Sequence, residues 1–178
     1  MRFILVGQEK PSAFEPRMKT ELATRLRLGK IRYLNTLPFY HGLAPQSGKN
    51  GFELEKETGS PNEINQKMRR GKIDAAPISS LEYLNHQEKY LLFPDLCIGS
   101  SDISASVLLL SHERIKGLNG ATISLSEESL SAATLVKILL KFKFKFQNHF
   151  RVEPSNPPEM LAHSRGCLVI GDDALFFR

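Results

Sequence analysis

The sequence has no long apolar run and few cysteines. Its amino terminus holds an apolar run of only four residues, Phe3 to Val6, whereas a secretory signal needs roughly seven to fifteen. No stretch approaches the roughly eighteen apolar residues of a membrane-spanning helix. We therefore predict a cytoplasmic protein with no membrane partner. The two cysteines, Cys97 and Cys167, lie in separate apolar stretches without a CxxC pair, which predicts buried free thiols and no zinc or redox motif.

Motifs for metal ions and phosphate groups are also missing. The five histidines show no HxxxH or HExxH spacing, so we expect no metal site, and no GxxxxGKS/T or GxGxxG loop is present. The formal charge of +5 suits an anionic ligand, but the excess lysines and arginines are spread along the chain and predict no nucleic-acid partner. We interpret KFKFKF at 141–146 as the end of a helix and its exit, because Phe142, Phe146 and Phe150 keep helical spacing.

An alternation of strand and helix is present from Leu28 onward, which predicts an α/β protein. The clearest helix begins after Ser60, where Pro61 suits the first turn and Glu63 completes a Ser-x-x-Glu capping box. A second box of the same kind begins at Ser79. Residues 1–26 show no sustained period, so we expect them to form a loosely ordered extension.

Small polar residues stand where predicted strands meet helices. They lie at four such junctions: Asn35, Ser79 and Ser80, Ser129 and Ser131, and Asp172. In open α/β sheets, ligands bind beyond the carboxyl ends of the strands, where helix amino termini offer free N–H groups and a partial positive charge. Each residue alone is more simply explained as an ordinary N-cap. Together, and without a glycine-rich loop, they favour a pocket for a small carboxylate.

Five stretches of the chain carry a family resemblance. They are GKIRYLNTLPFYHGL, GSPNEINQKMRRGKIDAAPISSLEYL, FPDLCIGS, SASVLLLS and VIGDDAL. In this order and at similar spacing, from about Leu28 to Leu175, they resemble the chorismate dehydratases of the futalosine route to menaquinone.

The resemblance implies an α/β fold like that of the type II periplasmic binding proteins, with two lobes around a central cleft. Lobe one would cover residues 27–101 and lobe two residues 102–178. Members of the family continue past the stretch that VIGDDAL resembles and cross back to lobe one, whereas this chain stops at Arg178. We therefore expect lobe one to lack its returning segments, and the sequence leaves open whether this chain alone is active.

The resemblance also implies a reaction, the loss of water from chorismate to give 3-[(1-carboxyvinyl)oxy]benzoate. That reaction makes the chain a hydro-lyase and requires no metal or redox cofactor. Asn35, in the stretch YLNTLP, is the expected catalytic residue. The expected substrate-binding residues are Tyr33, Thr36, Ser79, Ser80, Ser106, Ser129, Ser131 and Asp172. The oligomeric state is left open.

The main alternative is a non-catalytic protein of the same fold that binds a small carboxylate, either an inactive homologue or a solute-binding protein. A solute-binding protein would need a signal peptide or lipid anchor, and neither is visible. The sensing half of a transcription factor would need a helix-turn-helix before the first strand, and residues 1–26 are too few and too irregular for one. A sister enzyme acting on a naphthoate precursor is not expected to share the pairing of YLNTLP with APISS.

Overall fold

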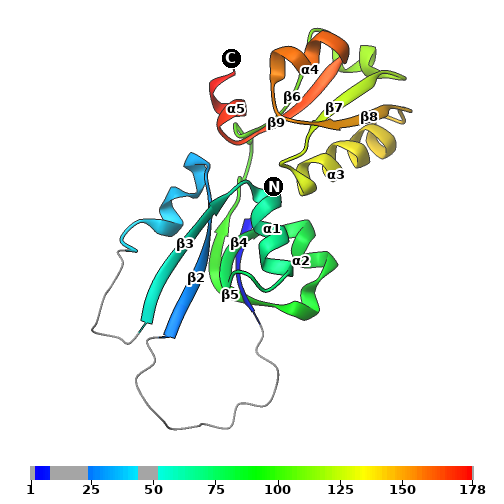
Figure 1. Cartoon of the computed structure of the whole chain (residues 1–178). Coiled ribbons are helices and arrows are strands. Elements are labelled where there is room, and N and C mark those ends of the chain that lie inside the picture. Colours follow the sequence, from blue (N-terminus) through cyan, green and yellow to red (C-terminus); the bar gives the residue numbers. More distant parts are fainter. Residues whose placement is uncertain (1–2, 9–23, 44–51, 178) are drawn as a thin grey trace. The chain divides into compact units, whose positions relative to one another are not determined.

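The computed structural model describes residues 3–8, 24–43 and 52–177 (Figure 1). The chain divides into two compact units. Among the described residues, the carboxyl-terminal unit comprises Tyr33–Asn35 and the chain from Gly99 onward, and the amino-terminal unit comprises those from Phe3 to Arg32 and from Thr36 to Ile98. The short segment Tyr33–Asn35 is thus grouped with residues that follow it by more than sixty positions, which the sequence did not predict.

The amino-terminal unit is built on a five-stranded sheet in the order β3-β2-β4-β1-β5. β2 runs parallel to β3 and β4, and β1 runs antiparallel to β4 and β5. Helices α1 and α2 lie on one side of this sheet (Figure 1). The elements are β1 (Phe3–Gln8), β2 (Thr24–Ile31), η1 (Leu34–Tyr40, whose first two residues group with the other unit), β3 (Phe52–Gly59), α1 (Pro61–Arg69), β4 (Ala75–Ser79), α2 (Ser80–Asn85), η2 (Gln87–Lys89) and β5 (Tyr90–Ile98).

Helix α1 begins as its capping box predicts. The Ser60 hydroxyl accepts a hydrogen bond from the Glu63 backbone N–H at 3.3 Å, and the Ser60 N–H donates to the Glu63 carboxylate at 2.7 Å. These two bonds satisfy N–H groups that a helix start would otherwise leave unpaired. Ile64 and Met68, four residues apart, are fully buried and attach the helix to the sheet.

Tyr40 fastens the end of η1 to strand β2. Its buried hydroxyl accepts a hydrogen bond from the Ile31 N–H at 3.1 Å and donates one to the Gly29 carbonyl at 3.0 Å. Burial disfavours the charged phenolate and raises the pKa of Tyr40 from 10.0 to about 12.

Alkaline solution is expected to weaken the fold through Tyr40. Because the pKa is higher in the folded chain than in the unfolded one, this stabilisation is complete below pH 10 and is lost as the pH rises to about 12. A pKa that is two units higher corresponds to a loss of about 3 kcal/mol in the free energy of unfolding. Urea unfolding across this range should therefore show a steeper decline for the native chain than for Tyr40→Phe. Tyr83→Phe is the reference substitution and should behave like the native chain. If the unfolding free energy of Tyr40→Phe declines as steeply as that of the native chain, this assignment is wrong.

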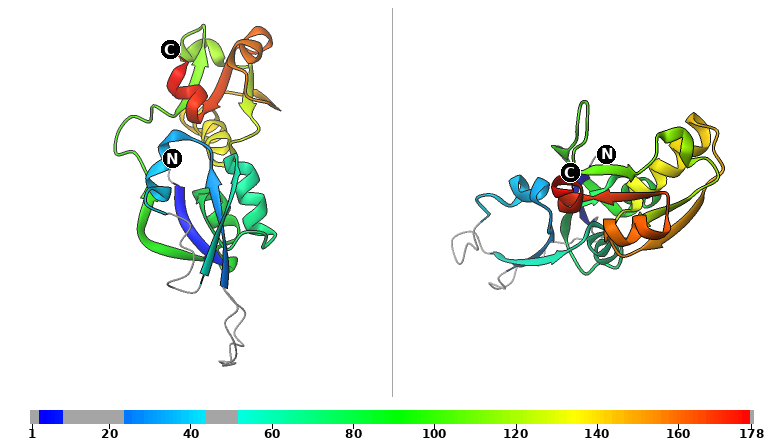
Figure 2. Two further views of the ribbon diagram at one scale, coloured as in Figure 1. Left: turned by 60° about the vertical axis from the view of Figure 1, so that its left-hand side comes forward. Right: turned by 90° about the horizontal axis from the view of Figure 1, so that it is seen from above.

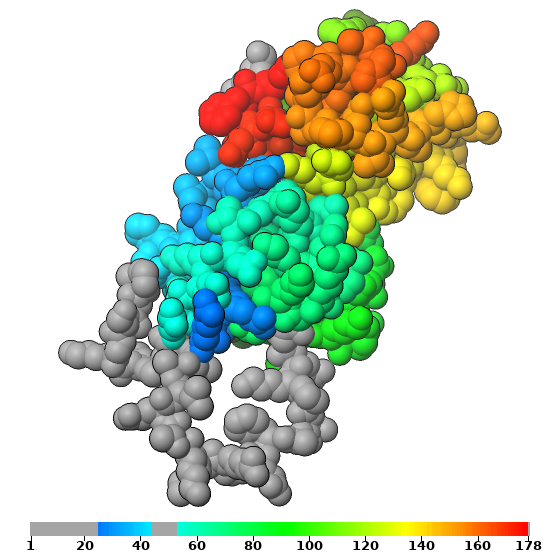
Figure 3. Space-filling model, in the orientation of Figure 1, coloured from blue at the N-terminus to red at the C-terminus, as the bar shows by residue number. Residues whose placement is uncertain are grey.

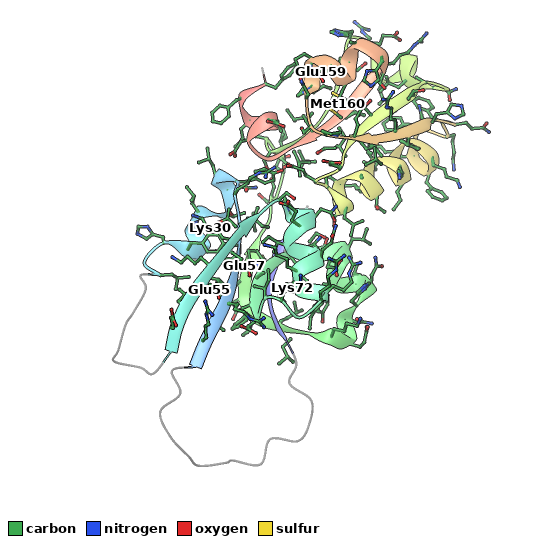
Figure 4. The ribbon with its side chains drawn as sticks, viewed as in Figure 1. Lys30, Glu55, Glu57, Lys72, Glu159 and Met160 are labelled. Atoms are coloured by element: carbon green, nitrogen blue, oxygen red, sulfur yellow. The ribbon has the colours of Figure 1, made fainter. Side chains whose placement is uncertain are left out.

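The two edges of the five-stranded sheet differ in character. Edge strand β3 carries Glu55 and Glu57 (Figure 4), which pair with Arg25 at 2.9 Å and with Lys67 at 2.5 Å. Charges of this kind discourage another strand from pairing with an edge. Edge strand β5 instead exposes large apolar side chains, with 44–52% of each accessible: Leu91, Leu92, Phe93 and Leu96.

Two predictions about this unit are corrected. The expected loose extension contains β1, which is held by backbone pairing with β4 and β5, and it also contains the start of β2 at Thr24. Long-range pairing stabilises β1, although its own sequence is too short to show a period. The rest of that extension, residues 1–2 and 9–23, lies outside the described residues. Cys97 was expected to be buried but is exposed because it lies on edge strand β5, whereas Cys167 is buried as predicted.

The carboxyl-terminal unit is built on a four-stranded sheet in the order β6-β9-β7-β8. β7 runs parallel to β8 and β9, and β6 runs antiparallel to β9. Helices α3 and α4 lie on opposite sides of the sheet (Figures 1 and 2), as right-handed crossovers from β7 to β8 and from β8 to β9 require. The elements are β6 (Val107–Ser111), η3 (Ile115–Leu118), β7 (Thr122–Ser126), α3 (Leu130–Ile138), η4 (Leu139–Lys143), β8 (His149–Glu153), α4 (Pro157–His163), β9 (Gly166–Ile170) and α5 (Gly171–Phe176).

The predicted α/β class is confirmed, since each sheet has helices packed on it. The run at 141–146 is the end of a helix, as predicted: α3 continues through the wider turn η4, and the chain leaves it at Lys145, which has a φ of 60°. The division into residues 27–101 and 102–178 stays a prediction, and the boundary between the compact units lies at Gly99.

Candidate active site

The carboxyl-terminal unit brings three chain segments together at one end of its strands. β7 and β9 are parallel, so the residues that follow them, including Glu128 and Asp172, leave the sheet at the same end. β6 is antiparallel to β9, with Val107 opposite Ile170, so Ser106, which precedes β6, lies at that end too. Ligands of open α/β sheets bind at the carboxyl ends of the strands.

Segment Tyr33–Asn35 of the same unit is hydrogen-bonded to all three of these segments. The Leu34 N–H donates to Asp172 Oδ1 at 3.1 Å. The Asn35 amide Nδ2 lies 3.4 Å from the Ser106 hydroxyl, and the Tyr33 hydroxyl donates to the Glu128 carboxylate. Four of the predicted site residues therefore meet in one unit: Tyr33, Asn35, Ser106 and Asp172.

Asn35 is unusual among these residues because its amide oxygen makes no hydrogen bond to the described residues. Its Oδ1 atom is buried and has no hydrogen-bond partner among the described residues. A buried acceptor that stays unpaired costs about 1–3 kcal/mol. Such groups are rare in native proteins, and a bound water or a ligand is one way in which the missing donor is supplied. Two other buried atoms of the described residues share this property, His86 Nδ1 and Asn148 Oδ1, but neither lies in the segments that meet here.

Glu128 is the site residue that the sequence analysis missed. It lies in the SEES run between β7 and α3, where an acidic residue looks like an ordinary partner of the helix dipole. The structure instead pairs its carboxylate with Tyr33, 95 positions earlier in the chain. One signal in the sequence pointed to Glu128: two adjacent carboxylates stand at a strand-to-helix junction that was expected to bind an anion.

Gly171 allows the Tyr33 ring to lie against the turn after β9. Its φ is 64°, and an added Cβ would lie 2.6 Å from the ring. Its N–H donates to the Ser106 carbonyl at 2.9 Å, which fixes the turn against the start of β6.

Replacing Gly171 by alanine is expected to lower the free energy of unfolding by more than the same change at Gly120. Both residues have a positive φ, 64° and 73°, so both substitutions carry the backbone strain of about 1–3 kcal/mol. Only at Gly171 does the new methyl group also collide with the Tyr33 ring, because nothing lies within 4 Å at Gly120. Chemical denaturation of both variants measures the difference, and equal losses would show that this contact is not tight.

The two site serines predicted near the start of α3 belong to the same unit but occupy different places in the helix. Ser129 is buried and is the N-cap of α3, since its hydroxyl accepts from the Ala132 N–H at 3.2 Å. Ser131 lies in the first turn of the helix and is half-buried. Their contact with a substrate stays a prediction.

The remaining predicted residues lie in the amino-terminal unit. Thr36 is fully buried, and its hydroxyl donates to the Ile31 carbonyl at 2.8 Å. Ser79 is buried and caps α2 at the Glu82 N–H, and its hydroxyl also accepts from the Asn65 amide at 3.2 Å. Ser80 follows it at the start of α2 and is half-buried. The structure thus gives Thr36 and Ser79 structural roles and leaves Ser80 the more accessible hydroxyl.

Metal and membrane features were searched for in the part of the chain that the structure describes. There, no group of three or more His, Cys, Asp or Glu side chains could hold a metal ion. None of the helices in that part combines the length and apolarity needed to cross a bilayer.

Solved structures with similar folds have low sequence identity to this chain. Protein AF1704 from Archaeoglobus fulgidus matches with a TM-score of 0.66 and 14% identity, over 86% of this chain and 56% of that one. The chain therefore spans little more than half the length of that relative. Two weaker matches are the regulatory domain of CcmR from Synechocystis, solved with 2-PG (TM-score 0.43, 13% identity, 87% of this chain and 76% of that one), and HinK, a LysR family transcriptional regulator from Pseudomonas aeruginosa (TM-score 0.38, 13% identity, 83% and 52%).

The family itself is given by a match along most of the chain. A family model described as menaquinone biosynthesis matches residues 26–178. This match confirms the family resemblance that the sequence showed, and the two units of sheet and helix have the expected α/β class. The chain belongs to the menaquinone biosynthesis family.

Proposed function

We propose that this chain acts on chorismate as a dehydratase in menaquinone biosynthesis. In this reaction the C3–H bond breaks, its electrons form the new ring double bond, and the C4–O bond breaks, so that a proton and a hydroxide leave as water. The C3 proton is vinylogous to the ring carboxylate, and its removal places negative charge on that carboxylate. Aromatisation drives the step, which needs no change of oxidation state.

The observation that carries the proposal is the unpaired oxygen of Asn35. Chorismate has a hydroxyl at C4, which can donate a hydrogen bond to a buried amide oxygen. A ligand that supplies this bond removes the desolvation cost of Asn35 Oδ1. Asn35 would in this way orient the C4 hydroxyl, with its own amide steadied by Ser106 at 3.4 Å.

A neutral amide is too weak a base to take the C3 proton. We therefore assign that step to a substrate carboxylate or to a water molecule, and we assign Asn35 the role of orienting the reacting carbon atoms. Positioning of this kind can account for a large part of a rate enhancement.

Ultraviolet spectroscopy tests the proposal directly. Mixing the purified chain with chorismate should replace the absorption of the cyclohexadiene by that of a benzoate, and mass spectrometry should show the loss of one water. Binding of chorismate without turnover would favour the alternative, a non-catalytic carboxylate-binding protein. If the chain neither binds chorismate nor converts it, the proposal is wrong.

Ser80 is expected to hold a substrate carboxylate rather than to act in the chemical step. Ser80→Ala should then raise KM by about tenfold, which corresponds to one hydrogen bond to a charged group, and leave kcat nearly unchanged. Ser79 is less suitable for this test, because its replacement also removes the cap of α2 and a partner of Asn65. Steady-state kinetics of Ser80→Ala, with exposed Ser101→Ala as the control, measures the effect. A fall in kcat at constant KM would contradict the assigned role.

A further inference from the structure

Helix α3 and its continuation η4 have an apolar face that their own unit does not bury. The helix attaches to the unit through Ala132, Val136 and Leu140, which are four residues apart and at most 7% exposed. A second apolar face has 38–60% of each side chain exposed: Leu135, Ile138, Leu139 and Phe142. Their spacing of i, i+3, i+4 and i+7 places them in one continuous stripe along the helix.

Positive charge surrounds this apolar stripe. Between Glu128 and Glu153 the sequence has no acidic residue, and it has five basic ones, Lys137, Lys141, Lys143, Lys145 and Arg151. That number equals the formal net charge of the whole chain, +5. The four lysines are all exposed. The space-filling view shows this yellow and amber part of the chain at the molecular surface (Figure 3).

A cleft lies beside the stripe. It has a volume of about 390 Å³, and its lining includes Lys137, Lys141 and Lys145 above an apolar base that contains Leu140, Phe146 and Phe150. The Lys137 Nζ lies 5.4 Å from the centre of the Phe150 ring, so aromatic faces help to hold the ammonium groups at this surface. No carboxylate lines the cleft.

We propose that the α3–η4 surface, defined as the apolar stripe with its four lysines and the cleft, docks onto an anionic lipid bilayer. Bulky apolar residues on an exposed face of a helix, with lysines beside them, are the features that bind at the headgroup level of a membrane. Leu135, Ile138 and Phe142 would enter the interface, while the lysines extend to lipid phosphates. The cleft between three lysines suits one phosphate headgroup.

This proposal departs from the prediction of no membrane partner, which depended on the lack of a spanning segment. A peripheral contact needs no spanning helix. It is therefore compatible with the absence of a membrane-spanning segment among the described residues. Charge decides the class of lipid. The four lysines are exposed and no carboxylate is among the residues that line the cleft, so a negatively charged leaflet is the matching surface, and each lysine is worth about fivefold in binding.

Sedimentation with lipid vesicles tests this proposal. The purified chain is mixed with vesicles of phosphatidylcholine alone and with vesicles in which about a third of the lipid is phosphatidylglycerol. We expect binding to the anionic vesicles only, and weaker binding at higher salt. The triple variant Lys137→Gln, Lys141→Gln, Lys145→Gln should bind about 100-fold more weakly, and Phe142→Glu should not bind measurably.

Two variants serve as matched controls. Lys116→Gln removes an exposed lysine of the same unit outside the α3–η4 surface, and Leu84→Glu places a charge at an apolar residue that is 64% exposed on α2. Both should bind anionic vesicles like the native chain. All variants replace exposed side chains, and circular dichroism verifies that each is folded.

Several outcomes would overturn the proposal. Equal binding to neutral vesicles, or no binding to either kind, would exclude an anionic bilayer as the partner. A dimer in analytical ultracentrifugation that Phe142→Glu dissociates would show that a second copy of the chain covers the stripe. Binding to single-stranded DNA that the triple lysine variant loses, without binding to vesicles, would assign the surface to nucleic acid.

Discussion

Asn35→Ala is expected to lower kcat/KM for chorismate by about 100- to 1000-fold, the cost of losing one preorganised polar group in an active site. The prediction depends on the proposed function and on the unpaired Oδ1 of Asn35. The fold should be nearly unaffected, because among the described residues this side chain has one hydrogen-bond partner, Ser106, at the long distance of 3.4 Å. Removing an unpaired buried oxygen could even leave the unfolding free energy slightly higher.

The control for this experiment is Asn85→Ala, an exposed asparagine at the end of α2. It should keep native activity and stability. Asn35→Asp retains an acceptor but loses the amide donor and adds a negative charge opposite an anionic substrate, so we expect it to be nearly as inactive as Asn35→Ala. Near-native turnover in Asn35→Ala would exclude Asn35 as the catalytic residue.

Arg69→Ala is expected to lower the free energy of unfolding by about 3–5 kcal/mol. Its partner Glu82 is fully buried, and the guanidinium donates two hydrogen bonds to that carboxylate, at 3.0 and 2.6 Å. The Tyr90 hydroxyl adds a third at 2.9 Å. The hydrogen bonds to Glu82 raise the pKa of Arg69, and burial, together with the Glu82 carboxylate, raises the pKa of Tyr90. Without Arg69, the buried Glu82 carboxylate would keep Tyr90 as its one side-chain partner among the described residues.

Urea denaturation measures this loss, and an exposed ion pair provides the comparison. Arg25 pairs with Glu55 at 2.9 Å, and both side chains are more than a third exposed, so Arg25→Ala should cost less than about 1 kcal/mol. Adding Glu82→Gln to Arg69→Ala should recover part of the stability, because it removes the uncompensated charge. If Arg69→Ala costs no more than Arg25→Ala, the network around Glu82 contributes little to the fold.

Local signals in the sequence predicted the helices well. The capping box at Ser60 and Glu63 forms with both of its bonds, and Pro61 stands in the first turn of α1 as predicted. These features depend on neighbours within one helical turn, so the sequence contains the necessary information. At Ser79 the local signal was only half right: the serine caps α2, but Glu82 pairs with Arg69 and Tyr90 instead of closing the box.

Features that depend on distant partners could not be predicted in this way. Strand β1 is held by β4 and β5, which lie about seventy and more positions later. Cys97 is exposed because β5 became an edge strand, which depends on the order of the whole sheet. The role of Glu128 required its pairing with Tyr33, and no spacing rule connects residues 95 positions apart.

Segment Tyr33–Asn35 also determines when during folding the candidate site can form. Its hydrogen bonds to Ser106, Glu128 and Asp172 close loops of 71, 95 and 138 residues. Loops of this length cost only slightly more conformational entropy than shorter ones, but contacts between distant residues form slowly. The sheet of the carboxyl-terminal unit can assemble from residues 107–170 alone. We therefore expect the candidate site to be completed after the sheet that supports it, once segment Tyr33–Asn35 has docked.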